Sequence, residues 1–232
     1  MQIACKTDVG LLRDHNEDCC AIGENFAIVA DGMGGHNKGE VASQVVTDAL
    51  TECFSKAETI SVELIKTAIK EANRAVYAES VSKPECSGMG TTVVAALWDD
   101  KKIVIGHIGD SRIYEVTKTG IKLLTKDHTL VQQLLDEGKI NEEEALTYPD
   151  KHVITRAVGT DAEETPDVLE LRRKKNQWIV LCSDGLSNYV NEKQIKECVN
   201  KYKDADKITE VLVEMANNGG GADNITAVAV EL

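Results

Sequence analysis

Four segments of the 232-residue chain place an aspartate beside glycine or another small residue at the end of an apolar run. In three of them the aspartate ends or follows the run, and in the fourth it precedes one. Strand ends in a layered sheet structure can converge on one edge, where four close carboxylates cannot all stay ionised without cations. The aspartates are Asp31, Asp110, Asp184 and Asp223, within segments 29–32, 108–111, 182–185 and 221–224.

These segments offer oxygen ligands, with no histidine or cysteine at ligand spacing. Such a set favours Mg²⁺ or Mn²⁺ over Zn²⁺. Two such ions that share a carboxylate can activate a water and stabilise an in-line displacement at phosphorus. Two other interpretations stay open. One is ordinary turns, in which Asp and Gly are common. The other is a phosphate-cradling glycine loop after Asp31, although neither GxxxxGKS/T nor GxGxxG is present.

The strongly polar segment 13–18 can contribute to the same chemistry. The planar guanidinium of Arg13 can bind two phosphate oxygens at once, which a lysine cannot do. Glu17 and Asp18 can accept hydrogen bonds from metal-bound waters and so hold them in place. Taken alone, the segment is more typical of a solvated loop.

Composition narrows the class of protein. The chain is 42% hydrophobic and carries a formal charge of −13, which argues against partners that are nucleic acids or anionic membranes. No stretch approaches 18 consecutive apolar residues, and the first six residues lack the features of a signal peptide. Seven cysteines without a C-x-x-C pair indicate reduced thiols in a cytoplasm, most of them small core hydrophobes.

Hydrophobic periodicity predicts an α+β fold. Apolar positions from residue 40 to 54 fall at helical spacing, and Ser61 is a typical N-cap for a second helix. Short connections between the central strands predict an antiparallel meander. The predicted strands are 2–8, 19–22, 26–30, 91–98, 102–109, 111–117, 121–124, 168–171, 177–182 and 225–232.

The interval 126–153 lacks a clear strand and is predicted to be a flap. Thr129 can cap a short helix that runs through Leu135, and Asn141 with Glu144 resembles a capping box. Later helices are predicted after the capping pair Asn191 and Gln194 and over 206–217. The basic run 172–175 is interpreted as a solvated turn in preference to a phosphate site. No repeat or linker divides the chain, so one domain over 1–232 is expected.

Six motifs in order resemble the metal-dependent protein phosphatases, the protein phosphatase 2C-like family. The resemblance covers the chain from about residue 8 to its C-terminus, and the Gly-Met-Gly-Gly that follows Asp31 is similar to the bacterial serine/threonine branch. The motifs are 13–18, 31–35, 90–92, 109–112, 183–185 and 223–226.

The resemblance implies a four-layer α-β-β-α sandwich, two antiparallel sheets flanked by helix pairs, with metals at one end. It implies that Asp31 bridges two ions while Gly32 supplies a carbonyl, and that Asp184 and Asp223 complete the first site. A third, looser ion is similarly expected at Asp110 and Asp184. Arg13 matches the phosphate-binding arginine, so Arg13, Asp31 and Asp184 are the expected catalytic residues. Support through hydrogen bonds is expected from Glu17, Asp18 and Asn224.

Met33 stands where some eukaryotic members carry a histidine that is thought to be a general acid. A metal-bound water is therefore expected to protonate the leaving group. His36, three residues further on, is a weaker alternative. Cys182 lies beside Asp184 but ends an apolar strand, and it is interpreted as a core residue.

The predicted function is hydrolysis of phosphoserine and phosphothreonine in proteins by direct attack of a metal-activated water, without a phosphoenzyme. The expected partners are phosphorylated proteins, including a serine/threonine kinase that the enzyme opposes, and the expected form is a cytoplasmic monomer. Three rivals stay open. They are a catalytically silent regulator on the same fold, a phosphatase with one dedicated anti-sigma-antagonist partner, and a metal-dependent phosphodiesterase or nuclease, against which the acidic charge counts.

Overall fold

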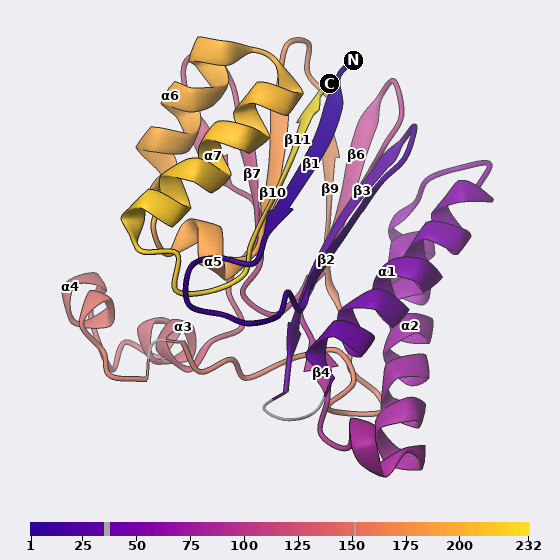
Figure 1. Ribbon diagram of the computed structural model, residues 1–232. Coiled ribbons are helices and arrows are strands. Elements are labelled where there is room, and N and C mark those ends of the chain that lie inside the picture. The colour runs from indigo at the N-terminus through magenta and orange to yellow at the C-terminus, as the bar shows by residue number, and fades with distance from the viewer. Residues whose placement is uncertain (35–37, 151) are drawn as a thin grey trace.

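Two antiparallel β-sheets pack face to face in the middle of the protein, and helices cover the outer face of each (Figure 1). The computed structural model describes residues 1–34, 38–150 and 152–232. One sheet has the strand order β1 (Ile3–Asp8), β11 (Ile225–Glu231), β10 (Trp178–Cys182), β7 (Arg112–Val116) and β8 (Ile121–Leu123). The other has the order β2 (Asp18–Ile22), β3 (Phe26–Met33), β5 (Val93–Trp98), β6 (Lys102–Ile108) and β9 (Asp167–Arg172).

Alternation along the strands builds three apolar layers. Ile28 of β3 packs in the cluster beneath the helices, while its neighbour Val29 packs between the two sheets. Successive side chains of a strand point to opposite faces, so a strand that is covered on both faces reads as an unbroken apolar run. This explains why residues 27–30 show no polar alternation. The four-layer sandwich expected from the sequence is confirmed.

Paired helices form the outer layers. Helices α1 (Gly39–Ser55) and α2 (Val62–Ser82) cover the sheet that contains β3, and α6 (Glu192–Tyr202) and α7 (Ala205–Gly219) cover the other (Figure 1). The predicted cap is present at Ser61, whose Oγ accepts a hydrogen bond from the backbone N–H of Leu64 at 3.0 Å. The capping box of Asn191 and Gln194 is also present. These local signals were sufficient because each cap involves residues only three positions apart.

Two connections differ from the prediction. The Gly109–Asp110 connection was expected to join two strands of one meander, and the basic run 172–175 was expected to be a turn between two strands. Each of these connections instead crosses from one sheet to the other. Strand β6 pairs with β5 and β9, whereas β7 pairs with β10 and β8. Gly109 adopts a φ of +106° at the first crossing, a conformation that side chains disfavour. The crossing puts Asp110 at the rim between the sheets.

The aspartate segments also differ in local structure. Strand β3 was expected to end at Ala30, but it continues to Met33 because the short strand β4 (Gly90–Thr91) pairs with its last residues. Asp31 and Gly32 therefore lie within a strand and not in the turn after it. Asp184 begins a short helix, α5 (Asp184–Ser187), which the sequence did not predict.

The predicted flap connects β8 to β9 and carries two short helices. These are α3 (Leu130–Asp136) and α4 (Glu142–Leu146), which lie beyond one end of the sandwich in Figure 1. The Thr129 cap and the Asn141–Glu144 capping box are both confirmed. The 3₁₀ helix η1 (Pro84–Cys86) lies before β4. Among the described residues, no helix combines the length and apolar character that a membrane crossing requires.

Close packing at Gly32 joins β3 to the start of α1. A Cβ at this position would lie 2.2 Å from the carbonyl oxygen of Gly39 and 2.6 Å from that of Glu17. Both neighbours are backbone atoms, which cannot move aside as a flexible side chain can. Gly32 is therefore required by packing, whatever its carbonyl binds.

We predict that Gly32→Ala lowers the free energy of unfolding by about 1–3 kcal/mol, because the added methyl group overpacks this contact. Urea unfolding of the metal-free protein measures the effect. The matched control is Gly120→Ala, where the nearest atom to a new Cβ is Thr117 Oγ1 at 3.9 Å. Equal stability of the two variants would contradict the packing argument.

Candidate active site

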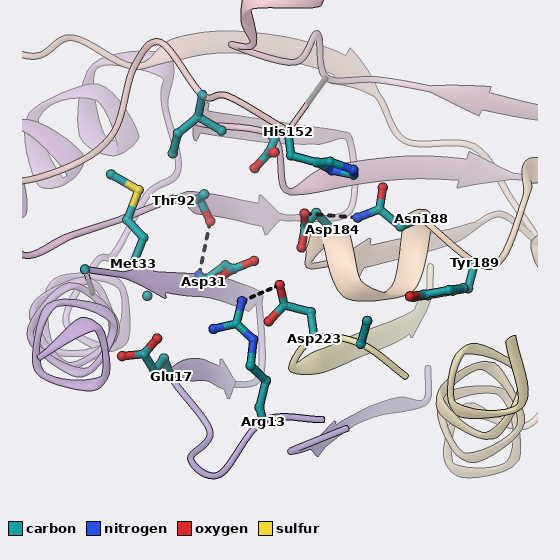
Figure 2. A pocket seen from close by; sticks show the side chains of 15 residues that line it. Arg13, Glu17, Asp31, Met33, Thr92, His152, Asp184, Asn188, Tyr189 and Asp223 are labelled. Atoms are coloured by element: carbon teal, nitrogen blue, oxygen red, sulfur yellow. Dashed lines mark hydrogen bonds and ion pairs between the residues drawn. The ribbon is translucent and has the colours of Figure 1, made fainter. Parts of the chain in front are cut away.

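The four aspartates line one cleft of about 650 Å³ at an end of the sandwich. Each comes from a different element: Asp31 from β3, Asp110 from the β6–β7 crossing, Asp184 from the start of α5, and Asp223 from the segment before β11. Figure 2 shows Asp31, Asp184 and Asp223 pointing toward one another. The convergence predicted from the four segments is thus present in the fold.

Hydrogen bonds fix the backbone of Asp31 from the side of β4. The carbonyl oxygen of Asp31 accepts from Thr91 Oγ1 and from the backbone N–H of Thr92, both at 2.9 Å. The N–H of Asp31 donates to Thr92 Oγ1 at 3.1 Å (Figure 2). A further contact of 2.7 Å joins Thr92 Oγ1 to Ser111 Oγ, next to Asp110. The 90–92 motif therefore positions two of the aspartates.

The other two aspartates have their own partners. Asn188, one helical turn after Asp184, donates from Nδ2 to Asp184 Oδ2 at 3.1 Å. Arg13 donates from Nη2 to Asp223 Oδ2 at 2.8 Å, with 48% of the arginine side chain exposed. The predicted phosphate anchor thus lies in the cleft and is paired with a predicted metal ligand.

Burial and mutual repulsion raise the pKa values of the cleft carboxyls. Burial raises the pKa of Asp31 well above its ordinary value, and the charges of Asp18 and Asp184 raise it further. The pKa of Asp184 is raised by burial and by Asp223, and the pKa of Asp110 is raised to about 7 by burial and by Asp184. In the absence of a cation these groups resist ionisation together.

Asp18 lies directly behind this cluster, opposite Asp31 in the β2–β3 register. Its Oδ2 accepts from Ser183 Oγ at 2.7 Å, but its buried Oδ1 has no hydrogen-bond partner among the described residues. Burial raises the pKa of Asp18 to about 7. An unpartnered carboxylate oxygen beside an all-oxygen cluster with raised pKa values fits a hard divalent cation such as Mg²⁺ or Mn²⁺.

Glu17 and Asn224 join the N-terminal loop to the site. Glu17 lines the cleft, and burial, followed by the charge of Glu40, raises its pKa. The Asn224 side chain accepts from the Glu17 N–H at 2.8 Å and donates to the carbonyl oxygens of Val9 and His15 at 2.9 Å each. Its polar atoms therefore hold the backbone of the loop that carries Arg13.

Several lining residues were missed from the sequence. They share the cleft with the aspartates but lie outside the segments and motifs singled out from the sequence: His152, Ile154, Asn188 and Tyr189. Asn188 was detectable in principle, because it lies four residues after Asp184, but only once α5 is known to be a helix. His152 had no local signal, since it reaches the cleft from the flap, across from Arg13 in Figure 2.

Met33 lines the cleft and offers no proton. The alternative donor named from the sequence, His36, lies outside the described residues, as does Gly35 of the same motif. The structure thus leaves His152 as the imidazole that lines the cleft in the described part of the chain.

A second group of possible ligands lies apart from the aspartates. The ligand atoms of His107, His128 and Asp167 are within 4.8 Å of one another. Arg156 lies among them: its Nη1 donates to Asp167 Oδ1 at 2.9 Å and approaches His128 Nε2 at 2.8 Å. The guanidinium occupies the position that a cation would need. These contacts, with the 2.9 Å hydrogen bond of His107 to the carbonyl oxygen of Lys126, hold the first residues of the flap.

Comparisons with known proteins agree with this geometry. The family profile described as Protein phosphatase 2C matches residues 13–227. Serine/threonine phosphatase stp of Listeria monocytogenes is 37% identical over 242 residues, which span 100% of this chain and 96% of the relative. Serine/threonine protein phosphatase PstP of Mycobacterium tuberculosis is 39% identical over 235 residues, which span 100% of this chain and 45% of the relative.

A solved structure is also similar throughout. The crystal structure of the catalytic domain of serine threonine protein phosphatase PstP in complex with 2 manganese ions has a TM-score of 0.91 and 36% identity. The match covers 100% of this chain and 98% of that one. The chain belongs to the protein phosphatase 2C family, in agreement with the resemblance of its motifs.

The raised pKa of Asp18 predicts a pH dependence of stability in the metal-free protein. The folded value of about 7 lies above the ordinary 3.8, so between these values the folded state binds more protons than the unfolded state. Stability therefore falls as the pH rises from about 4 to about 7 and then levels off. The parent should lose stability between about pH 4.5 and about pH 7.5, whereas Asp18→Asn should lack this loss. The stability of the variant minus that of the parent should therefore be larger at about pH 7.5 than at about pH 4.5.

Thermal unfolding of both proteins after treatment with a chelator measures this difference. Saturating Mg²⁺ serves as the control, because a bound cation would favour the ionised carboxylates of the parent at neutral pH. A parent and variant that differ by the same amount at both pH values would show that Asp18 does not titrate in this window.

Proposed function

We propose that this chain is a Mg²⁺- or Mn²⁺-dependent protein phosphatase that hydrolyses phosphoserine and phosphothreonine in proteins. The observation that carries the proposal is the convergence of Asp31, Asp110, Asp184 and Asp223 in one cleft beside Arg13. Burial raises the pKa of three of these carboxyls, which means that their ionised forms are unfavourable. A divalent cation offsets this unfavourable free energy by binding the carboxylates. The relatives that are named serine/threonine phosphatases cover the whole of this chain.

We assign two cations to Asp31, the Gly32 carbonyl, Asp184 and Asp223. When bound, these ions supply an activated water and neutralise charge on the phosphoryl group, so that attack is direct and needs no phosphoenzyme. The 2 manganese ions in the related PstP structure support this number and this kind of metal. Asn188 orients Asp184, and Thr91 and Thr92 hold the backbone of Asp31 in position.

Arg13 is proposed to bind the substrate phosphate. In the structure its guanidinium pairs with Asp223 at 2.8 Å. A cation that takes up the charge of Asp223 would release donors of this guanidinium toward a phosphate in the same cleft. Glu17, Asp18 and Asn224 are proposed to act through hydrogen bonds, Asn224 by holding the loop that carries Arg13.

The chain is proposed to act as one catalytic domain over 1–232, with the flap 126–153 beside the cleft. Its substrates are proposed to be phosphorylated proteins, including a serine/threonine kinase that it opposes. A cytoplasmic monomer is the proposed form. The free thiols of all seven cysteines support a reducing compartment.

The first test removes a shared ligand. Asp184→Ala should abolish metal-dependent turnover of a phosphopeptide and lower the metal content of the protein, because the proposed metal centre loses an oxygen ligand. Activity assays with EDTA, Mg²⁺ and Mn²⁺, together with elemental analysis, measure both effects. The matched control is Arg13→Ala, which should keep its metals and mainly raise KM. Metal-independent turnover by the parent would overturn the proposed mechanism.

A third, weaker cation is proposed at Asp110 and Asp184. Few protein ligands would hold it, which Mg²⁺ tolerates because it dehydrates reluctantly. Because Met33 offers no proton, the proton for the leaving oxygen is proposed to come from water in this part of the cleft. A serine leaving group needs that proton far more than an aryl leaving group does.

Asp110→Ala should therefore keep two bound metals and an intact fold while turnover falls at least about 10²-fold on a phosphopeptide. The loss should be clearly smaller on an aryl phosphate. Steady-state kinetics on both substrates, with metal analysis, gives the result. Asp184→Ala is the comparison, since it should abolish turnover of both substrates. If Asp110→Ala lost turnover equally on the phosphopeptide and on the aryl phosphate, water near Asp110 would not be the source of the proton for the leaving group.

A further inference from the structure

The thiols of Cys5 and Cys20 meet where the two sheets lie open at one edge. Strands β1 and β2 are the outermost of their sheets among the described strands, and they lie side by side. Within β1, Ala4 packs toward the helix layer and Ile3 packs between the sheets, so Cys5 shares the face of Ile3. Cys20 of β2 also packs between the sheets. The two side chains thus point toward each other from different sheets.

The two thiols influence each other's ionisation. Their interaction lowers the pKa of Cys5 to about 7 and raises the pKa of Cys20, so Cys5 is the sulfur that carries the negative charge more readily. Cys5 is exposed and Cys20 is half-buried. An accessible thiolate in contact with a second thiol is the arrangement in which oxidation leads to a disulfide.

The other cysteines lack this combination. Cys86, Cys182 and Cys198 are buried in the core clusters. Cys53 is half-buried against the cluster beneath α1 and α2, and burial raises its pKa. Cys19, the neighbour of Cys20, points to the opposite face of β2 and donates from Sγ to Gln44 Oε1 at 3.5 Å. Burial raises the pKa of Cys19, which makes it a weaker nucleophile at neutral pH.

We propose that Cys5 and Cys20 form a reversible disulfide that links the two sheets at this edge when the protein meets a hydroperoxide. The Cys5 thiolate attacks the O–O bond, which breaks to give a sulfenic acid on Cys5 and water or an alcohol from the peroxide. Cys20 sulfur then attacks Cys5 sulfur, the S–S bond forms, the S–O bond breaks, and a second water leaves. Two thiols are oxidised and one peroxide is reduced. A dithiol then reduces the disulfide back to the two thiols and is itself oxidised to a disulfide.

The disulfide would close a covalent ring over residues 5–20. This ring contains the loop that carries Arg13 and Glu17. On the β2 side, Cys20 is two residues from the buried Asp18, and it opposes Val29 of β3, two residues before Asp31. Oxidation would therefore restrain the segment that forms one wall of the cleft. Formation of this disulfide does not depend on the catalytic roles proposed above.

The experiment treats the full-length protein with a small excess of hydrogen peroxide, alkylates the remaining thiols and maps the peptides without reduction. The expected result is one cross-linked pair, Cys5 with Cys20, lighter by two hydrogens than the separate peptides and lost on treatment with dithiothreitol. A cross-link from Cys5 to Cys19, or Cys5 found as sulfinic acid without any cross-link, would overturn the proposal.

Serine variants provide the matched controls. Cys5→Ser and Cys20→Ser should each abolish the cross-link, whereas Cys19→Ser should leave its yield unchanged, because Cys19 faces α1. Thermal unfolding of each reduced variant checks that the fold is kept. In the parent, oxidation should raise the urea midpoint of unfolding, since the bridge closes a loop in the unfolded chain. Retention of the cross-link in Cys20→Ser would assign the bridge to another thiol.

Discussion

Repulsion between buried carboxylates is the constraint on which the rest of the site depends. Asp18, Asp31, Asp110 and Asp184 all have raised pKa values, and for each the first cause is burial. A flexible scaffold would relax by turning these side chains toward water. Here Thr91 and Thr92 hold the backbone of Asp31, and the side chain of Asn188 holds the carboxylate of Asp184. The fold thus keeps an unfavourable charge arrangement ready for cations.

The layered architecture provides the rigid positions. Strand β3 is buried on both faces over residues 27–30, so Asp31, which follows them in the strand, cannot shift without disturbing two apolar layers. Asp110 lies where the chain leaves one sheet for the other, next to the positive φ of Gly109. Close contact of Gly32 with Gly39 fixes the same region against α1. Packing far from the cleft therefore determines where its oxygens lie.

The network at the base of the flap shows how the same fold neutralises charge elsewhere. There Arg156 contacts Asp167 and Glu164 with its guanidinium, so the carboxylates have a cationic partner within the protein. In the cleft, Arg13 pairs with Asp223 only, and the other aspartates have no such partner among the described residues. The two clusters differ in their need for an external cation, and this difference favours a metal in the cleft.

The sequence by itself determined the features that depend on neighbouring residues. The caps at Ser61, Thr129 and Asn141 were correct because each links residues three positions apart. Most strands were correct because apolar runs and short turns are local signals. The spacing of the aspartates and their motifs also indicated the family before any geometry was known.

Only the tertiary structure decided which distant segments meet. Both sheet crossings were misjudged as turns because a short connection looks the same in either case. The extension of β3 to Met33 depends on β4, some 60 residues away. His152 in the cleft and Cys20 against Cys5 likewise follow from the packing of separate elements. Local pattern specifies each element, but contacts between elements arise only when the apolar layers pack together.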